Sequence, residues 1–242
     1  MNASVSTANK SGESRSFSFI FASEDLPEAQ VAFFEHLGLK VVPLPAFQRL
    51  DAPVAKHADM LLFPTEDGLL LPREYFESNR ALFEGVKVIC SGDTFSPEYP
   101  EDVRLNALNM DTGIICRADS VSEHIRSMGK RLINVAQGYA RCTVCKVNGN
   151  AIITADPSIV IAAKDNGIDA LQICGGEIRL PGYSYGFIGG ASVRIGDKMY
   201  FTGDITAHPD YDSIEAFLGA HGVTPVSLSK DILTDYGGFV LV

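Results

Sequence analysis

The sequence of 242 residues contains no apolar run that approaches the roughly 18 residues needed to span a bilayer. Proline or charged residues interrupt its longest candidates. The first 16 residues, MNASVSTANKSGESRS, also lack the apolar core of a signal peptide and the periodicity of a helix. We therefore expect a disordered tail over residues 1–16, a single domain over residues 17–242, a cytoplasmic location and no contact with a membrane.

Basic residues are few, and they form no cluster. Twenty Lys and Arg stand against thirty Asp and Glu, which gives a formal net charge of -10. Nucleic-acid binding depends on clustered Lys and Arg that neutralise phosphates. The sequence therefore argues against a nucleic acid as partner.

One pattern of strand, helix, glycine and second strand occurs five times along the chain. A glycine suits the position after a helix because that residue often adopts a left-handed backbone conformation. Prolines are well placed at the expected helix starts. The glycines predicted to end the five helices are Gly38, Gly85, Gly129, Gly167 and Gly222, and the prolines near their starts are Pro27, Pro72, Pro157 and Pro209.

Four of the five copies carry a further strand in front, which a turn signal joins to the next strand. These front strands are ADMLLFP (58–64), RLNALNM (104–110), CTVCKV (142–147) and FIGGASVRI (187–195). The first copy starts without one at residues 16–23, and YGGFVLV (236–242) is left over at the end. We therefore predict an α/β fold in which Phe239–Val242 pairs beside Ser18–Phe21 and closes five ββαβ units into a ring. An open three-layer sheet is the alternative.

This plan resembles the pentein superfamily of guanidino-group-modifying enzymes. The segments QGYARCTVC (137–145), LPGYSYGFIGGAS (180–192), GDITAHPDY (203–211) and LTDYGG (233–238) resemble an uncharacterised bacterial branch of that fold. The resemblance implies a five-bladed α/β propeller with pseudo-fivefold symmetry and a central pocket for a small polar molecule, and neither a cofactor nor a metal. Catalytic members carry a nucleophilic Cys near the last strand, whereas residues 235–242 contain no thiol.

Polar residues near the starts of the front strands would face the centre of such a ring. The candidates for substrate binding are Asn106, Asn109, Arg141, Tyr183, Tyr185, Asp204, Asp210 and Tyr236. The carboxylates of Asp204, Asp210 and Asp235 would pair with a guanidino cation through bidentate hydrogen bonds. A polar core whose groups satisfy one another is the alternative interpretation.

Cys142, His208 and Asp235 are the candidate catalytic residues. Imidazole titrates near neutral pH, and Asp204 and Asp210 flank His208, although His-Pro-Asp is also an ordinary helix start. Cys142 belongs to a lone CxxC with Cys145, and at that spacing on a strand the two thiols point to opposite faces. This spacing favours buried structural thiols over a metal pair, and Cys142 remains the thiol to test as a nucleophile.

The resulting hypothesis is a small-molecule protein that binds or hydrolyses a guanidino or amidino metabolite, as a deiminase-like or amidinohydrolase-like enzyme would. The alternative is a non-catalytic protein-interaction module of the same fold. The residues leave open whether the chain turns over a substrate, which substrate that is, and whether it forms a homo-oligomer.

Overall fold

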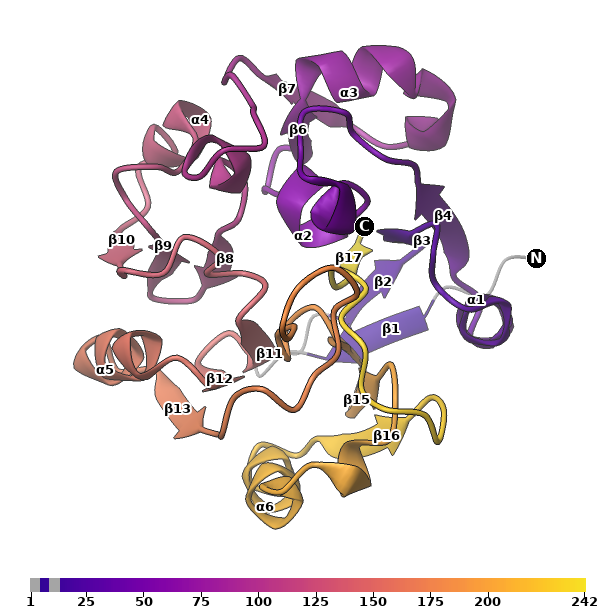
Figure 1. Cartoon of the computed structure of the whole chain (residues 1–242), viewed down its shortest axis with the longest axis vertical. Helices are drawn as coiled ribbons and strands as arrows, with labels where there is room; N and C mark the ends of the chain where they lie inside the picture. The colour runs from indigo at the N-terminus through magenta and orange to yellow at the C-terminus, as the bar shows by residue number, and fades with distance from the viewer. Residues whose placement is uncertain (1–4, 9–13) are drawn as a thin grey trace.

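The computed structural model describes residues 5–8 and 14–242, which form five small three-stranded sheets that follow one another around the molecule (Figure 1). In each sheet the first two strands are antiparallel, and the second and third are parallel. In unit order the sheets are β17 (Val240–Leu241), β3 (Phe19–Ser23) and β4 (Lys40–Leu44); β5 (Phe63–Pro64), β6 (Leu69–Pro72) and β7 (Val88–Ser91); β8 (Leu108–Met110), β9 (Gly113–Cys116) and β10 (Leu132–Asn134); β11 (Val144–Asn148), β12 (Ala151–Thr154) and β13 (Asp169–Gln172); β14 (Ser192–Ile195), β15 (Lys198–Phe201) and β16 (Thr224–Ser227).

A helix connects the second and third strands of each sheet and lies at the periphery in Figure 1. These helices are α1 (Glu28–His36), α3 (Arg73–Ser78), α4 (Glu123–Arg126), α5 (Pro157–Asp165) and α6 (Tyr211–Ala220). The five glycines predicted to end the helices all have a positive φ, between 68° and 87°. Gly85, however, follows the short helix η2 (Arg80–Phe83) and not α3, which ends at Ser78. The shorter helical segments are η1 (Ala52–Val54), α2 (Ala58–Leu61), η2 (Arg80–Phe83), η3 (Glu101–Val103) and η4 (Ile205–Ala207).

The C-terminal strand completes the first sheet, as the unequal count of strands predicted. β17 pairs antiparallel with β3, with Val240 opposite Phe21 and Leu241 opposite Ile20. The Val242 carbonyl also accepts hydrogen bonds from the backbone N–H groups of Ser18 and Phe19, at 2.9 and 3.0 Å. Two segments more than 200 residues apart in the sequence therefore form one sheet.

The front strands are shorter than the sequence pattern predicted. The segment 58–64 begins as the helical turn α2 and becomes a strand only at Phe63, and the segment 104–110 becomes a strand only at Leu108. All four residues of α2 are buried. A short apolar run that is buried on every side has no periodicity that separates helix from strand. The prediction of a strand at residues 58–61 was therefore wrong.

Neighbouring units share apolar cores. Val193 and Tyr200 of the fifth sheet pack in one buried cluster with Ile20 and Phe34 of the first unit, and Phe239 belongs to the same cluster. The rings of Phe34 and Phe239 have centroids 5.3 Å apart. The last strand therefore contributes apolar packing as well as backbone pairing to the contact between the fifth unit and the first.

Part of the segment predicted as a disordered tail is paired in the structure. β1 (Val5–Ala8) and β2 (Ser14–Phe17) form a two-stranded antiparallel hairpin. Residues 1–4 and 9–13 of the predicted tail lie outside the described residues.

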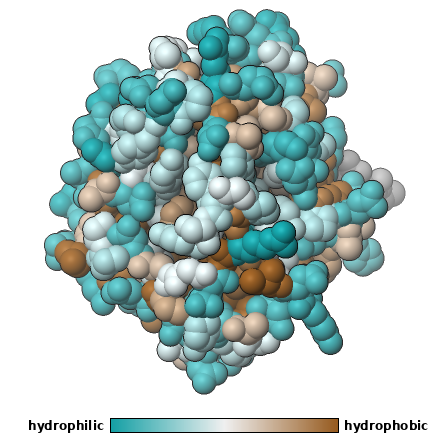
Figure 2. Space-filling view, viewed as in Figure 1, coloured by the Kyte–Doolittle hydropathy of each residue, from teal (hydrophilic) through white to brown (hydrophobic). Residues whose placement is uncertain are grey.

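The face seen in Figure 2 is covered largely by hydrophilic residues, with apolar residues in small separate patches. Within residues 5–8 and 14–242, every helix is too short or too polar to cross a membrane. The prediction of a homo-oligomer stays a prediction.

Asp156 is the N-cap of α5, and we expect Asp156→Ala to lower the free energy of unfolding by about 1 kcal/mol. One carboxylate oxygen accepts hydrogen bonds from the backbone N–H groups of Ser158 and Ile159, at 2.8 and 3.1 Å. Alanine leaves both donors without this acceptor. Urea denaturation followed by circular dichroism measures the loss, and Asp156→Asn, which keeps an acceptor, should remain close to the wild type. Equal losses in the two variants would rule out the capping role.

Candidate functional site

Two carboxylates and an imidazole are buried together where the start of the second unit meets the last loop of the chain. Asp59 lies on α2, His57 directly precedes that helix, and Asp235 lies in the segment that leads to β17. The His57 Nδ1 atom lies 4.0 Å from an Asp59 oxygen and 3.9 Å from an Asp235 oxygen. Asp59 is 0% exposed and Asp235 is 3% exposed.

Glycines allow these side chains to come together. A Cβ atom on Gly237, whose φ is +79°, would lie 2.2 Å from the His57 ring, and one on Gly190 would lie 1.8 Å from an Asp235 oxygen. The Gly237 carbonyl also accepts a hydrogen bond from the Asp59 backbone N–H, at 2.9 Å. Larger residues at these two glycines would occupy the space that the polar cluster fills.

The two carboxylates differ in their hydrogen bonding. Asp235 accepts from the backbone N–H groups of Phe187 and Gly237, at 2.9 and 2.8 Å. Within the described part of the chain, neither Asp59 oxygen has a partner with hydrogen-bond geometry, although the Cys142 thiol is near enough to lower the pKa of Asp59. A buried carboxylate without donors is costly, so Asp59 is the group in this cluster that lacks a partner.

Burial moves the pKa values of all three groups toward their neutral forms. Burial, with the Asp235 charge adding to it, raises the pKa of Asp59 to about 8. Burial also raises the pKa of Asp235 to about 6 and lowers the pKa of His57 to about 4. Near pH 7 the cluster therefore holds a neutral imidazole, and the two neighbouring carboxyl groups share about one proton.

Cys142, Asn106 and Arg141 adjoin this cluster, and the Asn106 side chain donates to the Asp59 carbonyl at 3.1 Å. The Asn106 side-chain N–H₂ donates to the Cys142 Sγ at 2.9 Å, and its oxygen accepts from the Arg141 backbone N–H at 2.7 Å. The Arg141 guanidinium donates to the Phe239 carbonyl. Burial, and then the charges of Asp59 and Asp235, raise the pKa of the Cys142 thiol well above its usual value. In this state Cys142 is a protonated, buried thiol.

Other residues predicted to bind substrate lie elsewhere. Asn109 donates to the Pro64 carbonyl from β8. Tyr183 and Tyr185 are 45% and 47% exposed, and the Tyr183 hydroxyl donates to Asp51. Tyr236 packs partly buried against the apolar cluster shared by the first and fifth units. The Asp204 carboxylate caps η4 by accepting from the Thr206 N–H.

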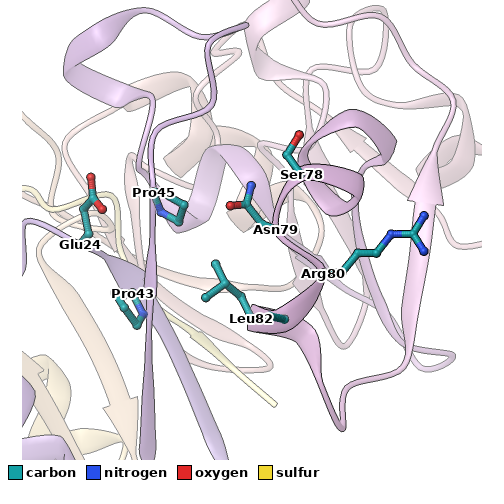
Figure 3. A pocket seen from close by; sticks show the side chains of 8 residues that line it. Glu24, Pro43, Pro45, Ser78, Asn79, Arg80 and Leu82 are labelled. Atoms are coloured by element: carbon teal, nitrogen blue, oxygen red, sulfur yellow. The ribbon is translucent and has the colours of Figure 1, made fainter.

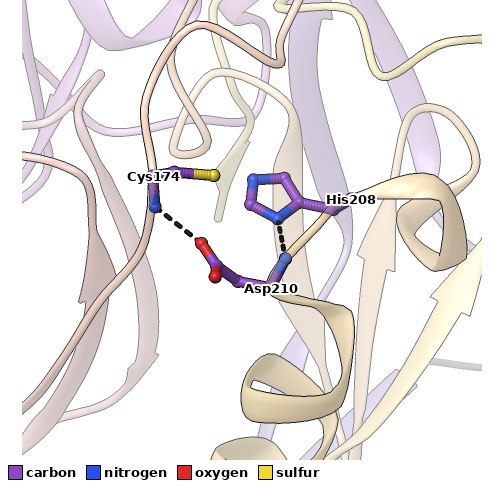
Figure 4. A group of neighbouring side chains, drawn as sticks. All are labelled: Cys174, His208 and Asp210. Carbon is purple, nitrogen blue, oxygen red and sulfur yellow. Dashed lines mark hydrogen bonds between the residues drawn. The ribbon is translucent and has the colours of Figure 1, made fainter.

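His208 and Asp210 lie with Cys174, in a separate group from Cys142 (Figure 4). The Asp210 backbone N–H donates to His208 Nδ1 at 3.1 Å, and the Asp210 carboxylate accepts from the Cys174 backbone N–H at 2.6 Å. Burial lowers the pKa of the His208 imidazole. The negative charges of Asp210 and Glu177 raise this pKa, but by less than burial lowers it. The geometry does not support the prediction that His208 acts as a base for Cys142, because each faces a different set of polar groups.

Sequence reasoning did not single out His57 or Asp59. Asp59 falls within the segment 58–64 that was predicted as a front strand, and His57 directly precedes it. An acidic residue inside the run HADMLLFP was the available signal, because a carboxylate surrounded by apolar residues is buried and needs a partner.

A cavity of about 410 Å³ lies between the fourth and fifth units. Gly186, Phe187 and Thr143 form part of its wall, with Cys174 and Glu177 elsewhere on its lining. The Phe187 N–H binds Asp235, so this stretch of backbone both lines the cavity and contacts one of the buried carboxylates.

A second cavity of about 390 Å³ lies between β4 and the segment that follows α3. Glu24, Pro43 and Asn79 are among its lining residues, and Figure 3 shows the Arg80 guanidinium pointing away from Glu24. Its few polar groups do not converge on one point, so the buried cluster with the first cavity is the better candidate site.

Solved structures similar to this chain include a dimethylarginine dimethylaminohydrolase (DDAH) and an agmatine deiminase. DDAH of Pseudomonas aeruginosa, complexed with citrulline, aligns with a TM-score of 0.54 at 10% identity, over 88% of this chain and 92% of that one. Agmatine deiminase of C. jejuni with substrate bound aligns with a TM-score of 0.53 at 9% identity, over 93% of each chain. The fold is therefore that of the pentein guanidino-modifying enzymes, and at these identities the likeness concerns the fold alone.

Sequence comparison places the chain more narrowly. No curated protein matches the sequence. A family model, described as a family of unknown function (DUF6873), matches residues 21–240, nearly the whole described domain. The chain belongs to this family, DUF6873.

Proposed function

We propose that this chain is a small-molecule, hydrolase-like protein whose five units close into a propeller around a central site for a guanidino or amidino cation. Asp59 and Asp235 are the cation-binding carboxylates of that site. His57 and Cys142 stand beside them as the proton acceptor and the thiol.

The observation that carries the proposal is the Asp59 carboxylate, which is fully buried and has no partner with full hydrogen-bond geometry among the described residues, the Cys142 thiol being the side chain that comes near it. A planar cation with several N–H groups donates two parallel hydrogen bonds to a carboxylate. Asp235 accepts two backbone N–H groups before a ligand arrives. A bound cation would supply Asp59 with donors and offset part of the negative charge of the two carboxylates.

Cation binding would also change the reactivity of Cys142. The Asp59 and Asp235 charges are among the causes that hold the pKa of this thiol high. A cation bound between them offsets that contribution. The pKa of the Cys142 thiol then falls, and a larger fraction of Cys142 is thiolate when the substrate is bound. The thiolate is the nucleophilic form, and its proton would pass to a neighbouring base. His57 is neutral near pH 7 and lies within 4.0 Å of both carboxylates, and we propose it as that base.

The cavity of about 410 Å³ offers the approach to this site. Gly186 and Phe187 form the wall between cavity and carboxylates, and the preceding loop carries the exposed Tyr183 and Tyr185. A shift of this loop would break the bond from Phe187 to Asp235 and expose the carboxylates to the cavity. We infer that a ligand enters by this route.

Calorimetric titration with agmatine and with 1,4-diaminobutane tests the proposal, because the two differ in a guanidino against an amino group. We expect agmatine to bind and to raise the melting temperature, with 1,4-diaminobutane at least about tenfold weaker because it lacks the planar donor pair. Asp59→Asn should abolish this preference. Mass spectrometry of the incubated mixtures, with Cys142→Ser as control, reports hydrolysis. Equal binding of both amines, or no binding by the wild type, would favour the protein-interaction module.

A further inference from the structure

We propose that Cys174, His208 and Asp210 form a binding site for a thiophilic divalent metal ion, for which Zn²⁺ is the natural probe. The site lies at the rim of the cavity between the fourth and fifth units and is distinct from the buried carboxylates of the proposed central site. The proposed metal site does not depend on ligand binding or catalysis at the central site.

Three donors of suitable chemistry converge there from separate parts of the fold. Cys174 follows β13 in the fourth unit, His208 follows η4 in the fifth, and Asp210 precedes α6. One ligand atom from each lies within 4.8 Å of the others (Figure 4). Thiolate, imidazole and carboxylate are the ligands that zinc takes in proteins, and in a tetrahedral site they stand about 3.5 Å apart. Metal binding would therefore require the ligand atoms to draw closer together than in this structure.

His208 provides the second and independent observation. The side chain is only 4% exposed, and its Nε2 atom has no hydrogen-bond partner within the described residues. Figure 4 shows this edge of the ring turned toward the Cys174 sulfur. A buried ring nitrogen without a partner is uncommon, because burial removes the water that would otherwise satisfy it. A metal ion bound between His208 and Cys174 would supply that partner.

The hydrogen bond at the other ring nitrogen, Nδ1, determines which nitrogen of the neutral His208 ring carries the proton. Nδ1 accepts from the Asp210 backbone N–H, which places the proton of the neutral ring on Nε2. Metal binding at Nε2 moves this proton to Nδ1, so the hydrogen bond from the Asp210 N–H is lost and two N–H groups face each other, while the Cys174 thiol loses its proton to solvent. The lost hydrogen bond and the two unpaired donors cost less than zinc coordination by thiolate and imidazole supplies.

The proposed site adjoins the cavity through Cys174, and its three protein ligands leave a fourth position of a tetrahedral ion for another ligand. Cys174 and Glu177 both line that cavity. The Glu177 charge acts on both Cys174 and His208 and favours a cation between them. Three protein ligands with a fourth position open to a cavity are the arrangement of catalytic zinc sites, whereas structural sites use four protein ligands. The ion would therefore be able to hold water or a small oxygen or nitrogen ligand in the cavity.

Titration of the intact protein with Co²⁺, which replaces zinc and reports its ligands spectroscopically, tests the site. We expect one equivalent to give a thiolate-to-cobalt charge-transfer band and the visible bands of tetrahedral cobalt, and one equivalent of Zn²⁺ to remove both. Cys174→Ser should lose the charge-transfer band, and Asp210→Asn should weaken binding at least about tenfold. Cys90→Ser, which changes a partly exposed thiol on β7, is the matched control and should behave as the wild type.

Circular dichroism spectra and melting temperatures taken without metal establish that each variant is folded. A charge-transfer band that survives in Cys174→Ser would assign the metal to another thiol and overturn the proposal. The absence of any cobalt band in the wild type at micromolar protein would overturn it as well.

Discussion

Deletion of residues 237–242 is expected to abolish cooperative folding of the whole domain. The deletion removes β17, so β3 loses its antiparallel neighbour and becomes an exposed sheet edge. It also removes the buried side chains of Phe239 and Val240, each 3% exposed. Loss of a buried Phe costs about 3 to 5 kcal/mol and each lost hydrogen bond about 1 kcal/mol. The sum approaches the 5 to 15 kcal/mol that stabilise a typical domain.

Urea denaturation followed by far-UV circular dichroism measures this loss. Phe239→Ala keeps the backbone of β17 and should lose about 3 to 5 kcal/mol, which separates the apolar contact from the strand pairing. Ile232→Ala is the matched control in the preceding loop, because that side chain is 57% exposed and its removal should leave the midpoint unchanged. A truncated chain with the wild-type unfolding midpoint would show that the first sheet does not depend on β17.

Binding of agmatine to the proposed central site is expected to become about fiftyfold tighter between pH 6 and pH 8. A guanidino cation pairs with the ionised form of Asp59, and burial raises the pKa of that carboxyl to about 8. The ionised fraction is about one half at pH 8 and about one hundredth at pH 6, and the apparent dissociation constant scales with its inverse. Asp235, with a pKa of about 6, adds to the same trend, whereas His57, at about 4, stays neutral throughout.

Calorimetric titrations at several pH values give the affinity, and the use of two buffers of different ionisation enthalpy gives the proton released on binding. Asp59→Asn should bind weakly and with little dependence on pH, because its amide carries no proton to displace. Asp204→Asn, which alters a carboxylate that caps η4 outside the cluster, should keep the wild-type profile. An affinity that is constant from pH 6 to pH 8 in the wild type would exclude Asp59 as the cation-binding group.

The local elements could be predicted from the sequence because short-range conformational preferences fix them. Gly38 and Gly222 end helices with a positive φ, which only glycine adopts without strain, and Asp156 caps the helix that begins at Pro157. The pairing of β17 with β3 followed from counting strands across the repeats. That inference needed no side-chain contact. The first unit lacks a front strand and the C-terminal strand belongs to no other unit, so the two are expected to pair.

The convergence of polar side chains was decided by the tertiary structure. His57 and Asp59 meet Asp235 because residues 58–61 form a helical turn and because Gly190 and Gly237 leave room, and neither fact is visible in hydrophobic periodicity. The hydrophobic pattern of an apolar segment that is buried on all sides does not distinguish a helix from a strand.

The association of His208 with Cys174 has the same origin. The two residues are 34 positions apart and lie in adjacent units, so they meet only when the fourth unit packs against the fifth. The sequence by itself determined the five units, their helix ends and the strand that joins the C-terminus to the first sheet, because each depends on local backbone preferences and on the order of elements. The packing of units decided which carboxylates, thiols and imidazoles lie within reach of one another, because those distances depend on contacts between residues far apart in the chain.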